Sequence, residues 1–86
     1  MIIFDNRYCQ YDEEERKMTV EEFFAEVNNN NYLNFGDGQI KVFDNNYFDE
    51  DLEAPIFRPL ELDERQWKSE VLIAHIFKNL IVLMIA

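Results

Sequence analysis

The sequence has 86 residues, 48% hydrophobic and 15% aromatic, which suits one small folded domain, residues 1–86, and is too apolar for a disordered chain. Asp and Glu number 18 against 8 Lys and Arg, which gives a formal net charge of -10 at pH 7. This charge excludes direct nucleic acid binding as the main function, because phosphate contacts need Lys and Arg. An acidic field instead favours a cationic partner.

Cys9 is the only cysteine, so no internal disulfide is possible, as expected for a reducing cytosol. The N-terminal sequence "MIIFDNRY" has no basic region followed by a long apolar stretch, so it is not a secretory signal. The C-terminal run "NLIVLMIA" is shorter than the roughly 20 apolar residues of a membrane-spanning helix. We therefore expect no membrane association.

The first two predicted elements are a strand and a short helix. Residues 2–11 carry β-branched and aromatic residues with partial alternation, which predicts one strand. Thr19 and Glu22 have the spacing of a capping box, and apolar residues then recur every three or four positions. A helix over residues 19–28 is expected, ended by the four asparagines of residues 28–31.

The middle of the chain predicts a hairpin and an acidic loop. The segments "YLNF" and "QIKVF" flank "GDG", residues 36–38, where glycine allows a tight reversal between two antiparallel strands. Residues 44–53 then show no helix or strand periodicity. Pro55 and Pro59 favour extended chain after this loop.

The C-terminal segment predicts a long apolar helix over residues 64–84. Asp63 can cap it with Gln66 at the third position, and apolar spacing continues from Trp67 to Met84. The alternative is that "LIVLMIA" forms a central buried strand beside "IIF". We favour the helix, because a helix that reaches Lys78 leaves almost no room for a turn. The expected fold class is α+β: a small antiparallel sheet of about three strands, a short helix and this long helix.

Motifs for catalysis or metal binding are missing from the sequence. A calcium loop that starts at Asp44 would need glycine at position six and glutamate at position twelve, where Asp49 and Pro55 stand. One histidine and one cysteine far apart cannot form a zinc site. We expect His75 on the solvent stripe of the long helix and Cys9 buried in its strand. No metal, cofactor or enzymatic activity is predicted, although a hydrolase or metal-dependent enzyme with converging acids stays an alternative.

The acids occur in blocks, as "DEEE" at residues 12–15 and "DNNYFDEDLE" at residues 44–53. Duplex DNA carries one negative charge per about 1.7 Å of its axis, so carboxylates held at similar intervals can occupy a groove built for phosphates. Aromatic residues inside the denser block would serve as interface anchors. The predicted partner-binding residues are Asp12, Glu13, Glu14, Glu15, Asp44, Tyr47, Phe48, Asp49, Glu50, Asp51 and Glu53.

With its small size and the blocks "YDEEE" and "DNNYFDEDLE", the chain resembles small acidic phage-encoded inhibitors, which include anti-CRISPR proteins and other DNA-mimicking anti-defence proteins. The resemblance implies a protein that blocks the nucleic-acid-binding groove of a host defence enzyme, such as a CRISPR effector or a nuclease. Members of this class share no common sequence, so no residue role is carried over. The alternative function is a structural or assembly module that forms a homodimer through its apolar end, residues 80–86.

Overall fold

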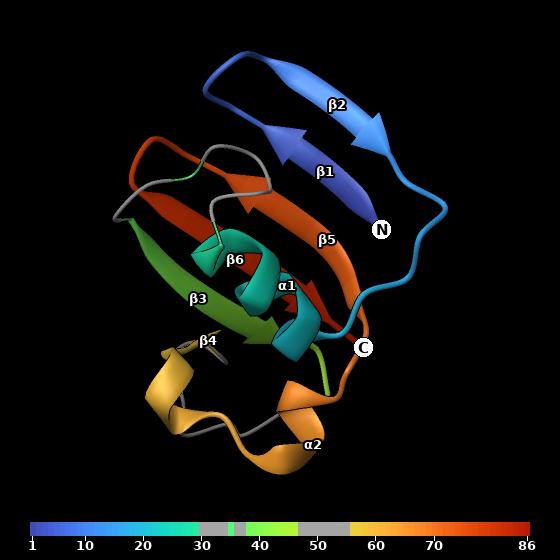
Figure 1. Cartoon of the computed structure of the whole chain (residues 1–86), viewed down its shortest axis with the longest axis vertical. Coiled ribbons are helices and arrows are strands. Elements are labelled where there is room, and N and C mark those ends of the chain that lie inside the picture. Colours follow the sequence, from blue (N-terminus) through green and yellow to red (C-terminus); the bar gives the residue numbers. More distant parts are fainter. Residues whose placement is uncertain (30–34, 36–37, 47–55) are drawn as a thin grey trace.

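The computed structural model describes residues 1–29, 35, 38–46 and 56–86. These residues form a six-stranded mixed sheet in the order β2-β1-β5-β6-β3-β4 (Figure 1). Its strands are β1 (Ile2–Asp5), β2 (Gln10–Glu13), β3 (Gln39–Asp44), β4 (Ile56–Phe57), β5 (Val71–Ile76) and β6 (Leu80–Ile85). The helical segments are α1 (Val20–Asn28), the 3-10 turn η1 (Pro59–Glu61) and α2 (Glu64–Trp67).

The predicted C-terminal helix over residues 64–84 is wrong. Asp63 and Gln66 do form a capping box, but α2 ends after one turn, and the chain continues as β5 and β6. β-Branched residues make up half of each strand and favour extended chain over helix. The missing turn needs only Lys78 and Asn79, because the Phe77 amide donates to the Leu80 carbonyl at 2.7 Å.

The predicted three-stranded antiparallel sheet is also wrong. β1 pairs with β5 in parallel, and β3 pairs with β6 in parallel, while β5 and β6 form an antiparallel hairpin at the centre. The alternative of a buried strand for "LIVLMIA" describes β6, but the neighbours of β6 are β5 and β3 instead of "IIF". Long-range parallel pairs of this kind have no local sequence signal.

The predictions for the N-terminal half agree better with the structure. Thr19 caps α1 as expected, with the Glu22 amide donating to Thr19 Oγ1 at 3.2 Å and the Thr19 amide donating to Glu22 Oε1 at 3.1 Å. The single strand over residues 2–11 is instead a hairpin of β1 and β2. The segment "QIKVF" is confirmed as part of β3, whereas most of its predicted partner "YLNF" lies outside the described residues.

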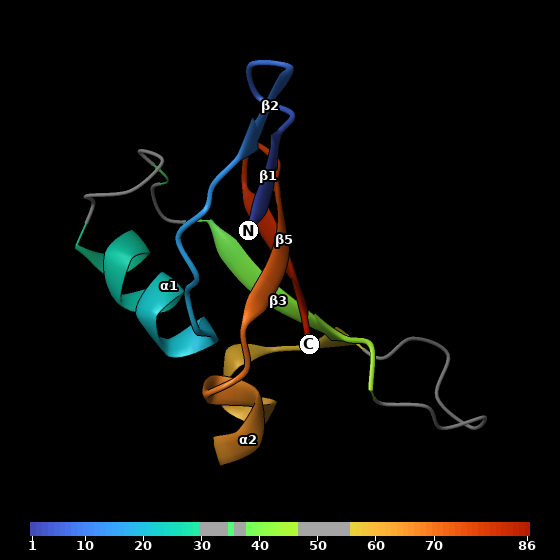
Figure 2. The same cartoon turned by 90° about the vertical axis from the view of Figure 1, so that its right-hand side faces the viewer.

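The hydrophobic core lies between one face of the sheet and α1 (Figure 2). Val20, Phe23 and Val27 of α1 are buried there. Along β6 the residues alternate, so that Ile81, Leu83 and Ile85 are fully buried while Leu80, Val82 and Met84 face the opposite side and are half-buried. Within the described ranges no helix covers that opposite side, which we call the open face (Figure 2).

Among the described residues, no helix is long and apolar enough to cross a membrane.

Candidate protein-binding surfaces

The first candidate surface is the acidic edge, which we define as Asp12, Glu13, Glu14 and Glu15. β2 is an outermost strand of the sheet, and all four of its residues are exposed. Asp12 lies opposite Ile3 and Glu13 opposite Ile2, so their side chains leave the strand on opposite faces. The Glu14 main chain is held by the N-terminus: its amide donates to the Met1 carbonyl at 2.8 Å, and its carbonyl accepts from the terminal ammonium at 2.9 Å.

Ion pairs engage most of the cations of this protein elsewhere. The pairs between described residues are Arg7 with Asp5, Arg16 with Glu26, Arg58 with Glu61, Arg65 with Asp44 and Lys68 with Glu64. The carboxylates of the acidic edge form no ion pair with any residue that the structure describes. Arg16 and Lys17 follow directly in the sequence and partly offset the negative potential of residues 12–15.

Asp44, a predicted partner-binding residue, lies in the interior, with a side chain that is 0% exposed. It accepts hydrogen bonds from Gln66 Nε2 at 3.0 Å, from the Asn46 amide at 2.9 Å and from the Arg65 guanidinium. Burial raises the pKa of Asp44, but the bonds from Gln66, the Asn46 amide and Arg65 outweigh burial, and the pKa is lowered. The predicted role of Asp44 in partner binding is therefore wrong: its side chain joins the end of β3 to α2 and offers no carboxylate to a partner.

The remaining predicted residues of the second acidic block belong to residues 47–55. Tyr47, Phe48, Asp49, Glu50, Asp51 and Glu53 all lie outside the described residues. Their role in partner binding therefore stays a prediction.

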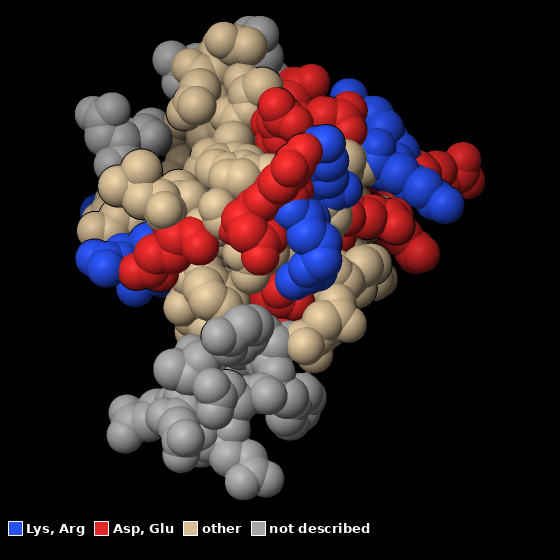
Figure 3. Space-filling model, turned by 90° about the horizontal axis from the view of Figure 1, so that it is seen from below, with Lys and Arg blue, Asp and Glu red and all other residues tan. Residues whose placement is uncertain are grey.

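The end of the molecule at α2 and η1 has mixed charge. Figure 3 shows acidic and basic side chains side by side there. Lys68 Nζ lies 2.8 Å from Glu64 Oε1, and the Arg58 guanidinium lies 2.8 Å from Glu61 Oε1. Neutralisation within these pairs makes this end a poorer match for a basic groove than the acidic edge.

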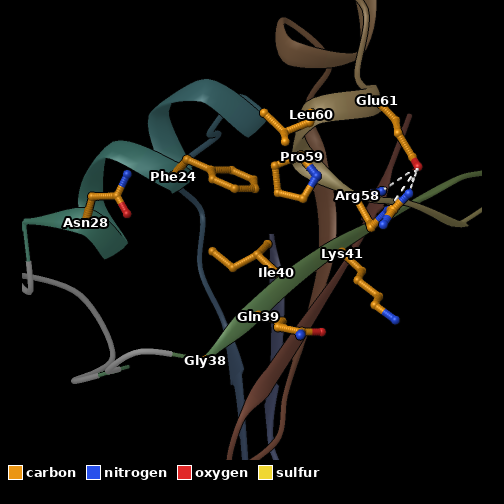
Figure 4. A pocket seen from close by; sticks show the side chains of 10 residues that line it. All are labelled: Phe24, Asn28, Gly38, Gln39, Ile40, Lys41, Arg58, Pro59, Leu60 and Glu61. Carbon is orange, nitrogen blue, oxygen red and sulfur yellow. Dashed lines mark hydrogen bonds and ion pairs between the residues drawn. The ribbon is translucent and has the colours of Figure 1, made fainter.

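A second candidate surface is a groove of about 540 Å³ between α1, the start of β3 and η1 (Figure 4). Phe24, Ile40, Pro59 and Leu60 give it apolar walls, while the Lys41 side chain points away from it. Leu60 is 101% exposed, which is unusual for such a large apolar residue. The groove is large and apolar enough to hold apolar side chains of a partner protein.

Sequence reasoning missed this groove, because its walls come from three segments that are distant in the sequence. The local signal is Leu60, a large apolar residue between Pro59 and Glu61 in the 3-10 turn η1.

His75 and Cys9 occupy other places than expected. His75 is on β5, where its ring stacks on Phe4 with centroids 5.1 Å apart and planes 15° apart. Cys9 is exposed in the turn between β1 and β2 and has a positive φ of 51°. The described part of the chain contains no group of three His, Cys, Asp or Glu residues that could hold a metal ion.

Comparisons with known proteins give no relative: no family model, no curated protein and no solved structure matches the chain. The acidic edge and the groove therefore carry the evidence on function.

Proposed function

We propose that the protein is a non-enzymatic inhibitor that binds the basic, nucleic-acid-binding groove of a host defence enzyme, such as a CRISPR effector or a nuclease. The supporting observation is the acidic edge, four consecutive carboxylates without a described ion-pair partner, of which Asp12 and Glu13 belong to the outermost strand β2 and Glu14 and Glu15 follow it directly. Such an inhibitor acts in the cytoplasm of a bacterial host and binds its partner where the partner would bind phosphates.

The spacing of these carboxylates suits the mimicry. A strand rises about 3.3 Å per residue, and one strand of duplex DNA carries a negative charge every 3.4 Å or so along the axis. This rise applies to Asp12 and Glu13 of β2, which are therefore offset along the strand by about the interval between successive phosphates. Asp12 and Glu13 leave β2 on opposite faces, so the carboxylates fit a groove with Lys and Arg on both walls.

The hairpin also holds the acidic edge in place before a partner arrives. β2 is paired with β1 along its whole length, and the Glu14 main chain is bonded to Met1. Because the backbone is already ordered, binding costs less conformational entropy than ordering a free acidic loop. The net charge of -10 adds long-range attraction, which raises the rate of encounter with a basic partner.

The first test is capture of partners from a bacterial lysate at low and at high salt, with bound proteins identified by mass spectrometry. We expect a basic nucleic-acid-binding enzyme at low salt and its release at high salt, because salt screens exposed charges. Purified enzyme should then lose activity when this protein is added. If no basic protein is captured, or if release does not depend on salt, the proposal fails.

Charge reversal identifies the surface. We expect Asp12→Lys with Glu15→Lys to weaken binding of the captured enzyme by about tenfold or more, as lost attraction becomes repulsion. The matched control is Glu21→Lys with Glu64→Lys, which changes the net charge equally at two exposed acids on α1 and α2. Equal loss in both variants would show that net charge matters and the acidic edge does not. Reversal of Asp49, Glu50 and Asp51 tests the second block in the same way.

A further inference from the structure

The open face of the sheet is lined by apolar side chains from all six strands. One cross-strand row joins Ile2, Ile73, Met84, Phe43 and Ile56. A second row joins Tyr11, Phe4, His75, Val82 and Lys41. Residues in register across a sheet project from the same face, so the two rows form one continuous surface.

This surface is much more exposed than the face under α1. Ile81, Leu83 and Ile85 on the covered face are 0% exposed, whereas Tyr11 is 57% exposed and Ile56 is 43% exposed on the open face. The other members of both rows are half-buried. A contiguous apolar surface of this kind on a small protein marks an interaction site.

We propose that the open face packs against the open face of a second copy of this chain, around a two-fold axis parallel to the strands and between β5 and β6. The sheet has three strands on each side of that axis. The axis therefore places β1 opposite β3, β2 opposite β4, and β5 opposite β6 of the second copy. Both sheets then bury their apolar rows at the usual spacing of about 10 Å.

The charges on the open face support a second copy as the occupant. Glu13 is on β2, at one end of the face, and Lys41 is on β3, in the other half. The two-fold axis brings Lys41 of each copy over the Phe4 ring of the other and next to the other Glu13. Lys41 has no ion pair with a described residue in the single chain, so the contact supplies an opposite charge and an aromatic face.

The size of the face fits a weak dimer. Strands about 4.8 Å apart with a rise of about 3.3 Å per residue give a projected area of roughly 400 Å². Rough side-chain surface adds to this, so the total buried area approaches the lower limit of about 1,000 Å² for specific interfaces. We therefore expect association in the micromolar range, and the like net charges of the two copies weaken it at low salt.

Sedimentation of the purified protein from about 1 μM to about 1 mM tests the proposal over the range of weak interfaces. We expect a monomer–dimer equilibrium that is unchanged or strengthened by added salt. This response is opposite to that of the acidic edge with a basic partner, so each proposal can fail without the other. A monomer at every concentration overturns the dimer and leaves the open face to a partner of different sequence.

Substitutions locate the contact. Val82→Lys puts a charge at the centre of the open face, and we expect the dissociation constant to rise by about tenfold or more. Leu60→Lys is the matched control, because Leu60 is fully exposed on η1 and outside the face. Circular dichroism checks that both variants stay folded. A dimer that persists in Val82→Lys overturns the proposal.

A charge swap tests the two-fold arrangement itself. Lys41→Glu alone places two acids together at each end of the interface, and Glu13→Lys alone places two cations there. Each single variant should weaken the dimer, and the double variant should restore it. Failure of the double variant to recover association overturns the contact between Glu13 of one copy and Lys41 of the other.

Discussion

Asp44 carries its charge inside the protein and depends on three donors, one from the turn after β3 and two from α2. Because its folded pKa is lowered, it adds stability at pH values above the usual carboxyl pKa of about 3.9. That contribution is lost as the pH falls from there through the lowered folded value. The pKa of Asp5 is lowered mainly by a side-chain hydrogen bond from Arg7, so its contribution to stability depends on pH in the same direction.

We expect Asp44→Asn to lower the free energy of unfolding at pH 7 by about 2–4 kcal/mol. The buried side-chain amide would place its own NH2 donor against the donor groups of Gln66 and Arg65. The deficit should shrink below pH 4 or so, where wild-type Asp44 becomes protonated on unfolding. Urea denaturation at pH 7 and pH 3 measures both values. The exposed Asp12→Asn serves as control, and an equal deficit at both pH values would contradict the assignment.

Cys9 has the left-handed backbone conformation that glycine adopts without strain. Cys9→Gly should therefore raise the free energy of unfolding by about 0.5 kcal/mol, as relief of strain exceeds the entropy of the freer unfolded chain. Cys9→Val should lower it by about 1 kcal/mol, because β-branched residues tolerate positive φ worst. Thermal or urea unfolding gives the order Gly, Cys, Val. Equal stability of the glycine and valine variants would refute the strain.

Single residues also show where sequence reasoning stopped. Asp44 was grouped with the acidic block that follows it, although it lies two residues after Val42 and four after Ile40, on the same buried face of β3. That alternation was a usable signal. Its cation Arg65 is 21 positions away, so the pairing itself was not predictable.

At the scale of elements, α1 was predicted well because its signals are local: a capping box followed by an apolar stripe. β5 and β6 were mistaken for a helix because nearly every position in residues 71–85 is apolar, and periodicity cannot separate a buried helix from strands there. The β-branched residues and the turn at Lys78 and Asn79 indicate two strands more reliably than the apolar periodicity indicates a helix.

The α1 cap makes a prediction of its own. Thr19→Ala removes the acceptor for the Glu22 amide and should cost about 1 kcal/mol of unfolding free energy. Thr19→Ser keeps the hydroxyl and should cost far less. Chemical denaturation monitored by circular dichroism compares the two. Similar losses for serine and alanine would mean that the methyl group of Thr19, and not its hydroxyl, stabilises the helix start.

For the whole molecule, the residue patterns indicated a mixture of helices and strands, but neither the strand order nor the open face could be derived. Both depend on parallel pairs between distant segments, β1 with β5 and β3 with β6. Which acids stay unpaired likewise depends on how the fold positions the cations. The four acids of the acidic edge were predicted as partner-binding residues, whereas the position of Asp12 and Glu13 on an outermost strand was not predicted.

The central position of β6 has a consequence for protein synthesis. β6 lies between β5 and β3 in the sheet, and it leaves the ribosome after all the other strands of the sheet. Until it emerges, β2, β1 and β5 cannot be joined to β3 and β4, and the apolar residues of both halves stay accessible. Folding of the sheet must therefore follow translation of the last strand, when non-local pairing is slow and chaperones can bind the nascent chain.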